Sequence, residues 1–149
     1  MKTKHLPFSI DKPEKSPGLS LWQATTTWQR LIKKTLEEYE VSHAQFVILA
    51  VTFWLEKQNL EIQQSIIIKW TKLDKMTVSQ ALKKLSQKKI VIQKENSNDT
   101  RAKLISLTKT GATLTSKLIS LVEIIDEKFF KKLNKDEKNQ LLFLLQKLI

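Results

Sequence analysis

The 149-residue sequence contains no cysteine, only 2 glycines and only 3 prolines. The absence of cysteine excludes disulfide bonds, thiolate metal sites and thiol-based redox sensing from this chain. The low glycine content, together with 41% hydrophobic residues, favours a folded and mostly helical protein over a disordered one. No apolar run approaches the roughly 18 residues that span a bilayer, and no apolar signal segment follows Met1. We therefore expect a cytoplasmic protein with no membrane partner.

Sequence signatures of catalysis and of metal binding are also missing. No nucleophile elbow, P-loop or dinucleotide-binding loop is present. His5 and His43 are far apart and, without cysteine, do not form a metal-binding pattern. Glu37, Glu38 and Glu40 form an acidic cluster that is more typical of a solvated helix face than of catalytic carboxylates. The sequence thus predicts neither an enzyme nor a bound cofactor.

Basic residues outnumber acidic residues in the sequence. The chain has 26 basic and 15 acidic residues, a formal net charge of +11. Such an excess favours a polyanionic partner, either nucleic acid or an acidic membrane surface, although a lysine-rich solvated surface is the simpler interpretation. Charge alone does not choose between these alternatives.

The chain divides into an arm and one domain. Residues 1–18 contain all the prolines and show weak periodicity, so we interpret them as a flexible arm. Apolar residues then recur at helical spacing over residues 19–39, and Ser42 with Gln45 forms a capping box that opens the next helix. Thr108 opens a long helix over about residues 109–132, and Asn134 with Glu137 opens a final one.

A helix-turn-helix pattern occupies the middle of the chain. One short apolar helix is expected over about residues 63–72, and Asp74 supplies the start of the next. In this second helix Val78, Leu82 and Leu85 fall on one apolar stripe. The other side is short, polar and basic, which suits a DNA major groove. Its residues are Lys75, Met76, Thr77, Ser79, Gln80, Lys83 and Lys84.

Two β-rich runs follow, at residues 90–95 and 101–107. The linker between them, residues 96–100, is polar and rich in turn-forming residues, so the three segments predict a β-hairpin. A hairpin directly after a helix-turn-helix is the arrangement of a winged helix, and the polar tip would be the part that reaches a partner.

Four local patterns, taken together at their spacing, point to a family. They are residues 41–49, residues 73–80, residues 99–101 followed by Leu107, Thr108 and Gly111, and residues 133–134 with Glu137. In this combination the chain resembles the MarR family of bacterial winged-helix transcription regulators, over roughly residues 19–149. It departs from relatives at the helix-turn-helix corner, where Lys72 stands in place of the frequent glycine, so that the turn must form without one.

The resemblance implies a mainly α fold with a small β-hairpin wing. A winged helix-turn-helix lobe at about residues 42–108 would be joined to dimerisation helices at about residues 19–40 and 109–149. A homodimer is also expected because the terminal helices carry more apolar surface than a monomer can cover. The residues expected to make the dimer contact are Leu21, Trp28, Leu118, Leu144 and Leu148.

Each predicted DNA contact has a chemical reason. The Gln80 amide can pair with adenine, Thr77 and Ser79 can reach bases or phosphates, and the lysines of this helix should meet phosphates. In the wing, Arg101 suits the negative potential of the minor groove, and Asp99 can orient its guanidinium through a bidentate pair. Asn98 and Lys103 are expected to contact the DNA backbone. The simpler interpretation of each residue is a solvated polar surface.

The function that follows is sequence-specific binding of double-stranded DNA. We expect a homodimeric repressor on a pseudo-palindromic operator, and the resemblance implies release by a small aromatic effector. Trp22, His43 and Phe46 are candidates to line an effector pocket, although core packing explains them more simply. Two alternatives remain open: a nonspecific or plasmid- or replication-associated winged-helix DNA binder, and a winged-helix protein-interaction scaffold.

Overall fold

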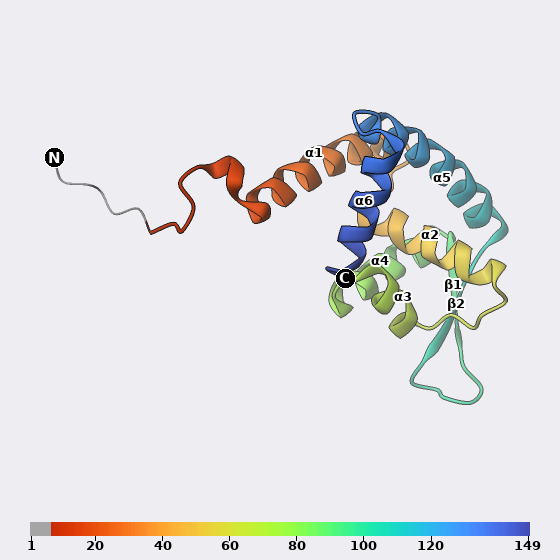
Figure 1. The fold of residues 1–149 in the computed structure, drawn as a ribbon. Coiled ribbons are helices and arrows are strands. Elements are labelled where there is room, and N and C mark those ends of the chain that lie inside the picture. The colour runs from red at the N-terminus through yellow and green to blue at the C-terminus, as the bar shows by residue number, and fades with distance from the viewer. Residues whose placement is uncertain (1–6) are drawn as a thin grey trace.

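The computed structural model describes residues 7–149 and confirms a mainly α fold with one β-hairpin (Figure 1). The helices of this part of the chain are joined by short connections, and the hairpin lies between the fourth and fifth α-helices. The elements are η1 (Pro13–Lys15), α1 (Pro17–Glu37), α2 (His43–Lys57), α3 (Gln64–Thr71), α4 (Lys75–Gln87), β1 (Val91–Glu95), β2 (Lys103–Leu107), α5 (Lys109–Phe130) and α6 (Lys135–Gln146).

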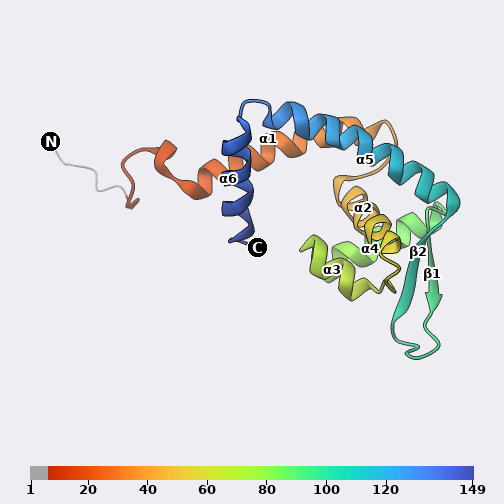
Figure 2. The ribbon, with the colours of Figure 1, turned by 45° about the vertical axis from the view of Figure 1, so that its right-hand side comes forward.

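The helices form two groups. Helices α1 and α5 run side by side across one end of the molecule in both ribbon views (Figures 1 and 2). Helices α2, α3 and α4 form a lobe beneath them, from which the hairpin projects away from α1 and α5. Helix α2 is the centre of this arrangement, since it contacts α1, α3, α4, α5 and β2. The lobe is thus held against the two long helices through α2.

The first helix begins earlier than predicted. Pro17 occupies its first turn, where a missing N–H costs nothing, and the Ser16 hydroxyl accepts the Leu19 N–H at 3.1 Å. The predicted arm therefore contains the start of α1 as well as the short turn η1. His5 lies outside the described residues.

Two predicted capping boxes are confirmed. In α2, Ser42 accepts the Gln45 N–H at 3.1 Å and the Gln45 side chain accepts the Ser42 N–H at 3.0 Å. In α6, Asn134 and Glu137 exchange the same pair of bonds, at 2.9 and 3.3 Å. Each box satisfies two N–H groups that a helix start leaves free.

Four helices end on left-handed residues, none of which is glycine. Glu40, Asn59, Lys72 and Lys89 have φ angles of 53°, 56°, 59° and 57°. At Lys89 the arrangement is a Schellman motif, because the Lys89 N–H donates to Ser86 and the next N–H donates to the Leu85 carbonyl. Lys72 makes the corner between α3 and α4, which confirms that this turn forms without glycine. Left-handed backbone is unfavourable for residues with a Cβ. All four residues are exposed, and backbone hydrogen bonds to the preceding helix close each of these corners.

One hydrophobic core connects the lobe to the long helices. It contains fully buried side chains from α2, from the apolar stripe of α4 and from the facing sides of α1 and α5. Its fully buried aliphatic residues are Ile32, Leu36, Ile48, Leu49, Leu55, Ile67, Val78, Leu82, Leu85, Val91 and Leu118. Because close-packed cores resist deformation, this core fixes the orientation of α4 relative to α1 and α5.

Candidate nucleic-acid interface

The second helix of the helix-turn-helix, α4, has the two faces that the sequence predicts. Val78, Ala81, Leu82 and Leu85 are buried. The exposed face carries six of the seven predicted contact residues, at positions spaced one helical turn apart. These residues are Lys75, Met76, Ser79, Gln80, Lys83 and Lys84. The polar and basic side of α4 is therefore turned outward and is accessible to a large partner.

The seventh residue, Thr77, has a structural task at the start of α4. It is half-buried, and its hydroxyl donates to Asp74 Oδ2 at 2.6 Å. The Thr77 N–H donates to Asp74 Oδ1 at 2.8 Å, so Asp74 caps the helix as predicted. These hydrogen bonds lower the pKa of Asp74, the Thr77 hydroxyl contributing most, and keep its carboxylate ionised at the helix N-terminus. The hydroxyl proton of Thr77 is thus engaged within the protein.

The wing is a regular antiparallel pair with a polar tip. Val91 pairs with Leu107 and Glu95 with Lys103, so the tip comprises residues 96–102. Asn98 and Arg101 in the tip and Lys103 at the start of β2 are exposed, as expected for side chains that contact DNA. The predicted second strand was too long by two residues, because Arg101 belongs to the tip and β2 begins at Lys103.

Asp99 behaves differently from the prediction. Its carboxylate accepts the backbone N–H of Arg101 at 3.0 Å, and within the described residues it forms no ion pair with the Arg101 guanidinium. A short side chain reaches the backbone two residues ahead more easily than it reaches the end of an arginine. The predicted bidentate pair is therefore wrong: Asp99 shapes the tip and leaves the guanidinium free for another partner.

A cleft lies between the wing and α4, which is the recognition helix of the helix-turn-helix. It has a volume of about 530 Å³ and lies between the start of α3, the start of α4 and the hairpin. Three cations line it, Lys75 from α4 with Arg101 and Lys103 from the wing, and no acidic side chain of residues 7–149 does. Gln63, which precedes α3, and Gln64 and Ser65 in its first turn also line the cleft and were not predicted from the sequence. The start of α3 carried no polar pattern that distinguishes these residues from an ordinary helix start.

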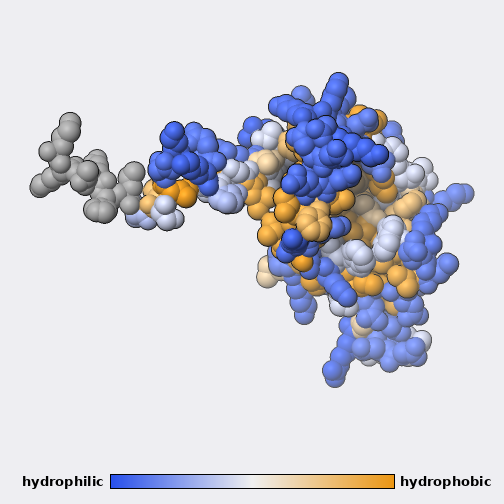
Figure 3. Space-filling model, in the orientation of Figure 1, coloured by the Kyte–Doolittle hydropathy of each residue, from blue (hydrophilic) through white to orange (hydrophobic). Residues whose placement is uncertain are grey.

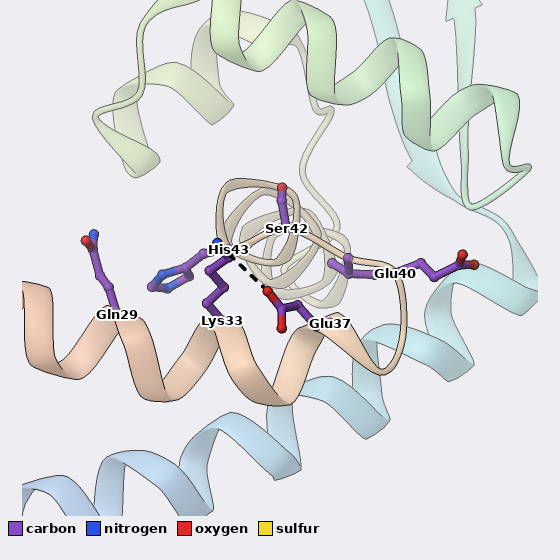
Figure 4. A pocket seen from close by; sticks show the side chains of 7 residues that line it. Gln29, Lys33, Glu37, Glu40, Ser42 and His43 are labelled. Carbon is purple, nitrogen blue, oxygen red and sulfur yellow. Dashed lines mark ion pairs between the residues drawn. The ribbon is translucent and has the colours of Figure 1, made fainter.

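A second hollow of about 490 Å³ lies at the corner between α1 and α2 (Figure 4). Gln29, Lys33 and Glu37 from α1 line one side and His43 lies opposite; Lys33 and Glu37 form an exposed ion pair at 3.8 Å. Burial lowers the pKa of His43, and the negative charge of Asp126 opposes this shift in part. The imidazole is therefore biased toward its neutral form.

The predicted pocket residues are only partly brought together. His43 lines this hollow, but Phe46 is buried in the core and its ring is 6.5 Å from the His43 ring. Trp22 is 71% exposed and does not line the hollow. Trp28, which was not predicted to be part of a pocket, packs edge-on against the His43 ring with 5.1 Å between the ring centroids. Its Nε1–H donates to Asp126 Oδ1 at 2.7 Å.

The residues predicted to make a dimer contact separate into two groups. Leu21, Leu144 and Leu148 are 51%, 50% and 73% exposed, as an uncovered apolar surface requires. Leu118 is fully buried within the single chain, so the prediction that it contacts a second chain is wrong. Trp28 is half-buried and is engaged by Asp126.

Neither a metal cluster nor a membrane-spanning helix is present in the described part of the chain. Between residues 7 and 149, no group of three or more His, Cys, Asp or Glu side chains converges on one point. No helix within the same range is long and apolar enough to cross a bilayer.

An outward-facing recognition helix beside a hairpin wing defines the class of winged-helix DNA-binding domains. Residues 37–126 match the family of ArnR1-like winged-helix domains. The chain is also 34% identical over 125 residues to the HTH-type transcriptional regulator YdcH of Bacillus subtilis, and the match covers 84% of this chain and 85% of YdcH. The chain therefore belongs to the ArnR1-like winged-helix family and is a helix-turn-helix transcriptional regulator of the MarR type.

Solved structures agree with this assignment. A mutant of Escherichia coli MarR in complex with operator DNA is 26% identical, with a TM-score of 0.77, over 89% of this chain and 92% of MarR. Bordetella bronchiseptica BpsR is 23% identical and shares the fold with a TM-score of 0.83, over 93% of this chain and 96% of BpsR. The predicted family and fold are thus confirmed.

Proposed function

We propose that the protein is a homodimeric repressor that binds a pseudo-palindromic operator in double-stranded DNA. The observation that carries this proposal is the exposed polar face of α4, which adjoins a cleft lined by Lys75, Arg101 and Lys103. A helix presented in this way fits a major groove, and the wing then lies over the adjacent backbone and minor groove. MarR, a relative of the same fold, has been crystallised with operator DNA.

The division of labour on DNA follows from side-chain chemistry. Gln80 is exposed near the middle of α4 and pairs with an adenine edge, whereas Lys83 and Lys84 neutralise phosphates. Arg101, whose guanidinium is not held by Asp99, enters the minor groove. The net charge of +11 makes affinity fall steeply as salt rises, because each neutralised phosphate releases counterions.

The uncovered apolar surface supports the dimer. Helix α6 has no buried residue, although it carries Leu142, Phe143, Leu144 and Leu145. Figure 3 shows apolar surface on the lower part of α6 and beside it. A helix this apolar needs a covering partner in water. A second copy of the chain supplies an equivalent surface and also gives the twofold symmetry that a palindromic operator requires.

The hollow at the α1–α2 corner is our candidate for the effector site. It lies where the lobe joins the long helices, so a bound molecule there would favour one lobe spacing over another. His43 supplies a ring for a small aromatic acid, and Lys33 supplies a cation once its exposed ion pair with Glu37 opens. The structure of BpsR was described as explaining the regulation of its DNA binding by 6-hydroxynicotinic acid.

Fluorescence anisotropy with labelled duplexes tests the proposal. Wild-type protein should prefer one duplex sequence over a scrambled competitor. Gln80→Ala should reduce that preference by roughly 1–3 kcal/mol, whereas Lys84→Ala should weaken binding to both duplexes alike and lower the salt slope by about 0.9. Equal binding to both duplexes by the wild type would indicate a nonspecific binder, and no binding to either would indicate a scaffold.

Sedimentation velocity tests the dimer separately. Wild-type protein should sediment as a dimer, and Leu144→Glu combined with Leu148→Glu should yield monomers because two charges would enter the apolar contact. Gln146→Glu, at the end of α6 and between the two replaced positions, adds charge without replacing an apolar side chain and serves as the control. A monomeric wild type would contradict the proposed assembly.

A further inference from the structure

Two N–H groups on the edge of β2 that does not face β1 donate hydrogen bonds to two different kinds of acceptor. Strand β2 pairs with β1 on one side, and on its other side the N–H groups of Ile105 and Leu107 face the body of the lobe. The Ile105 N–H donates to the Ile62 carbonyl at 2.8 Å. The Leu107 N–H donates instead to a side chain, the carboxylate Oε1 of Glu56, at 2.7 Å.

The Glu56 carboxylate accepts the hydrogen bond that a carbonyl of a neighbouring strand would otherwise accept. The extended segment beside β2 is limited to an isolated bridge between Gln63 and Leu104, so it does not extend along the edge as far as Leu107. Glu56 lies in the last turn of α2, which contacts β2. Its bond to Leu107 is partly buried and involves a charged acceptor, conditions under which a hydrogen bond is short and comparatively strong.

The hydrogen bond between Glu56 and Leu107 lies at the base of the hairpin, where a small rotation displaces the tip. Leu107 is at the base of the hairpin, and β2 carries the chain roughly 13 Å from Leu107 to Lys103. Arg101 lies two residues further on, in the tip, so it is at most about 20 Å from the base. A rotation of about 10° at the base would displace the tip by roughly 3 Å, which is the length of a hydrogen bond. The anchoring of Leu107 therefore affects whether Arg101 meets its target.

We propose that Glu56 is a positioning residue, which sets the angle of the wing so that Arg101 enters the minor groove. This role rests on the proposed function, since it presupposes that Arg101 binds DNA. Glu56 itself touches no DNA. It acts through the backbone of Leu107, and its effect on binding passes through the wing.

The sign of the effect separates this role from simple electrostatics. Glu56 is negative in a protein with a net charge of +11, so the removal of its charge alone should strengthen DNA binding. Two conservative variants separate the effect of the Glu56 charge from the effect of its side-chain length. Glu56→Gln removes the charge but keeps an oxygen acceptor at the same distance, and Glu56→Asp keeps the charge but shortens the side chain by one methylene.

Binding to a labelled duplex that carries the sequence selected by the wild type provides the first test. Glu56→Asp should weaken binding by about tenfold, as expected for the loss of one groove contact, and Glu56→Gln should bind at least as well as the wild type. Glu61→Asp, an exposed glutamate in the same part of the chain, should have no effect. Wild-type affinity of Glu56→Asp, or equal weakening by Glu56→Asp and Glu56→Gln, overturns the proposal.

A double-mutant cycle tests whether the effect passes through the wing. Arg101→Ala should weaken binding in the wild-type background and have little further effect in Glu56→Asp, because the contact is already lost. Gln80→Ala should have its full effect in both backgrounds, since α4 does not depend on Glu56. Additive losses for Glu56→Asp and Arg101→Ala would contradict a positioning role.

Amide hydrogen exchange without DNA distinguishes failure of this role from failure of the function. The Leu107 amide should exchange faster in Glu56→Asp than in the wild type and in Glu56→Gln, while amides of α4 stay unchanged. Unchanged exchange at Leu107 would overturn the proposal that Glu56 holds the Leu107 amide, whatever the DNA-binding results. If exchange responds as expected but the wild type binds no duplex, the proposed function fails and the role of Glu56 on DNA fails with it.

Discussion

The carboxylate of Asp74 holds Thr77 through two hydrogen bonds, from the hydroxyl at 2.6 Å and from the backbone N–H at 2.8 Å. Asp74 is solvent-exposed, so hydrogen bonding and not burial accounts for its lowered pKa. The start of the recognition helix therefore depends on one ionised side chain. Thr77 is better understood as part of this cap than as a group free to select a base.

Thr77→Val should raise the pKa of Asp74 toward its ordinary value of 3.8, because the hydroxyl bond is the largest cause of the shift. Carbon-detected NMR titration of the carboxylate measures this pKa, with Thr77→Ser as the control that keeps the hydroxyl. A group with a lowered folded pKa stabilises the fold above the unfolded pKa, and this contribution disappears as pH falls through the folded pKa. The stability that Asp74 confers should thus be complete above about pH 4 and decline below it. Identical pKa values in wild type and Thr77→Val would refute this account of the cap.

Lys72→Gly should stabilise the protein by about 1 kcal/mol, because glycine adopts a φ of 59° without the steric cost that a Cβ incurs. Urea unfolding measures the change. Lys69→Gly provides the matched control, since Lys69 is an exposed lysine inside α3, where glycine should cost about 1 kcal/mol. Opposite signs for the two variants are expected, and a loss of stability in both would contradict the description of this corner.

Gly111→Ala should destabilise the protein by roughly 2 kcal/mol or more. A Cβ at this position would lie 2.0 Å from the Ile90 carbonyl oxygen, so α5 and the base of the wing would have to move apart. Gly18→Ala is the natural control, because a Cβ there meets nothing closer than 4.0 Å and alanine favours the helix. Equal unfolding midpoints for Gly111→Ala and the wild type would show that this close approach is not maintained in solution.

The recognition helix could be predicted because its determinants are local. The Asp74 cap and the spacing of Val78, Leu82 and Leu85 lie within about three helical turns, and each follows from backbone geometry alone. The hairpin was predictable for the same reason, since its two strands are adjacent in the sequence. Its exact strand start was not, because Asp99 bonds the Arg101 backbone and shifts that residue into the tip.

Contacts between distant segments could not be predicted. Glu56 and Leu107 are 51 residues apart, and no local pattern indicates that one holds the other. Leu118 shows a related limit: helical spacing identifies an apolar stripe but not which surface covers it, and here the covering surface belongs to the same chain. Asp99 had two possible partners in Arg101, the backbone and the guanidinium, and sequence alone does not distinguish them.

Selection of bound sequences from a random pool of duplex DNA tests the central claim most directly. A dimer that inserts two copies of α4 into the major groove should enrich an inverted repeat whose half-site centres lie about 10 base pairs, or a multiple of that, apart. Gln80→Ala should lose selectivity at one position in each half-site and retain the repeat. Enrichment of no sequence, or of a single site without inverted symmetry, would contradict the account.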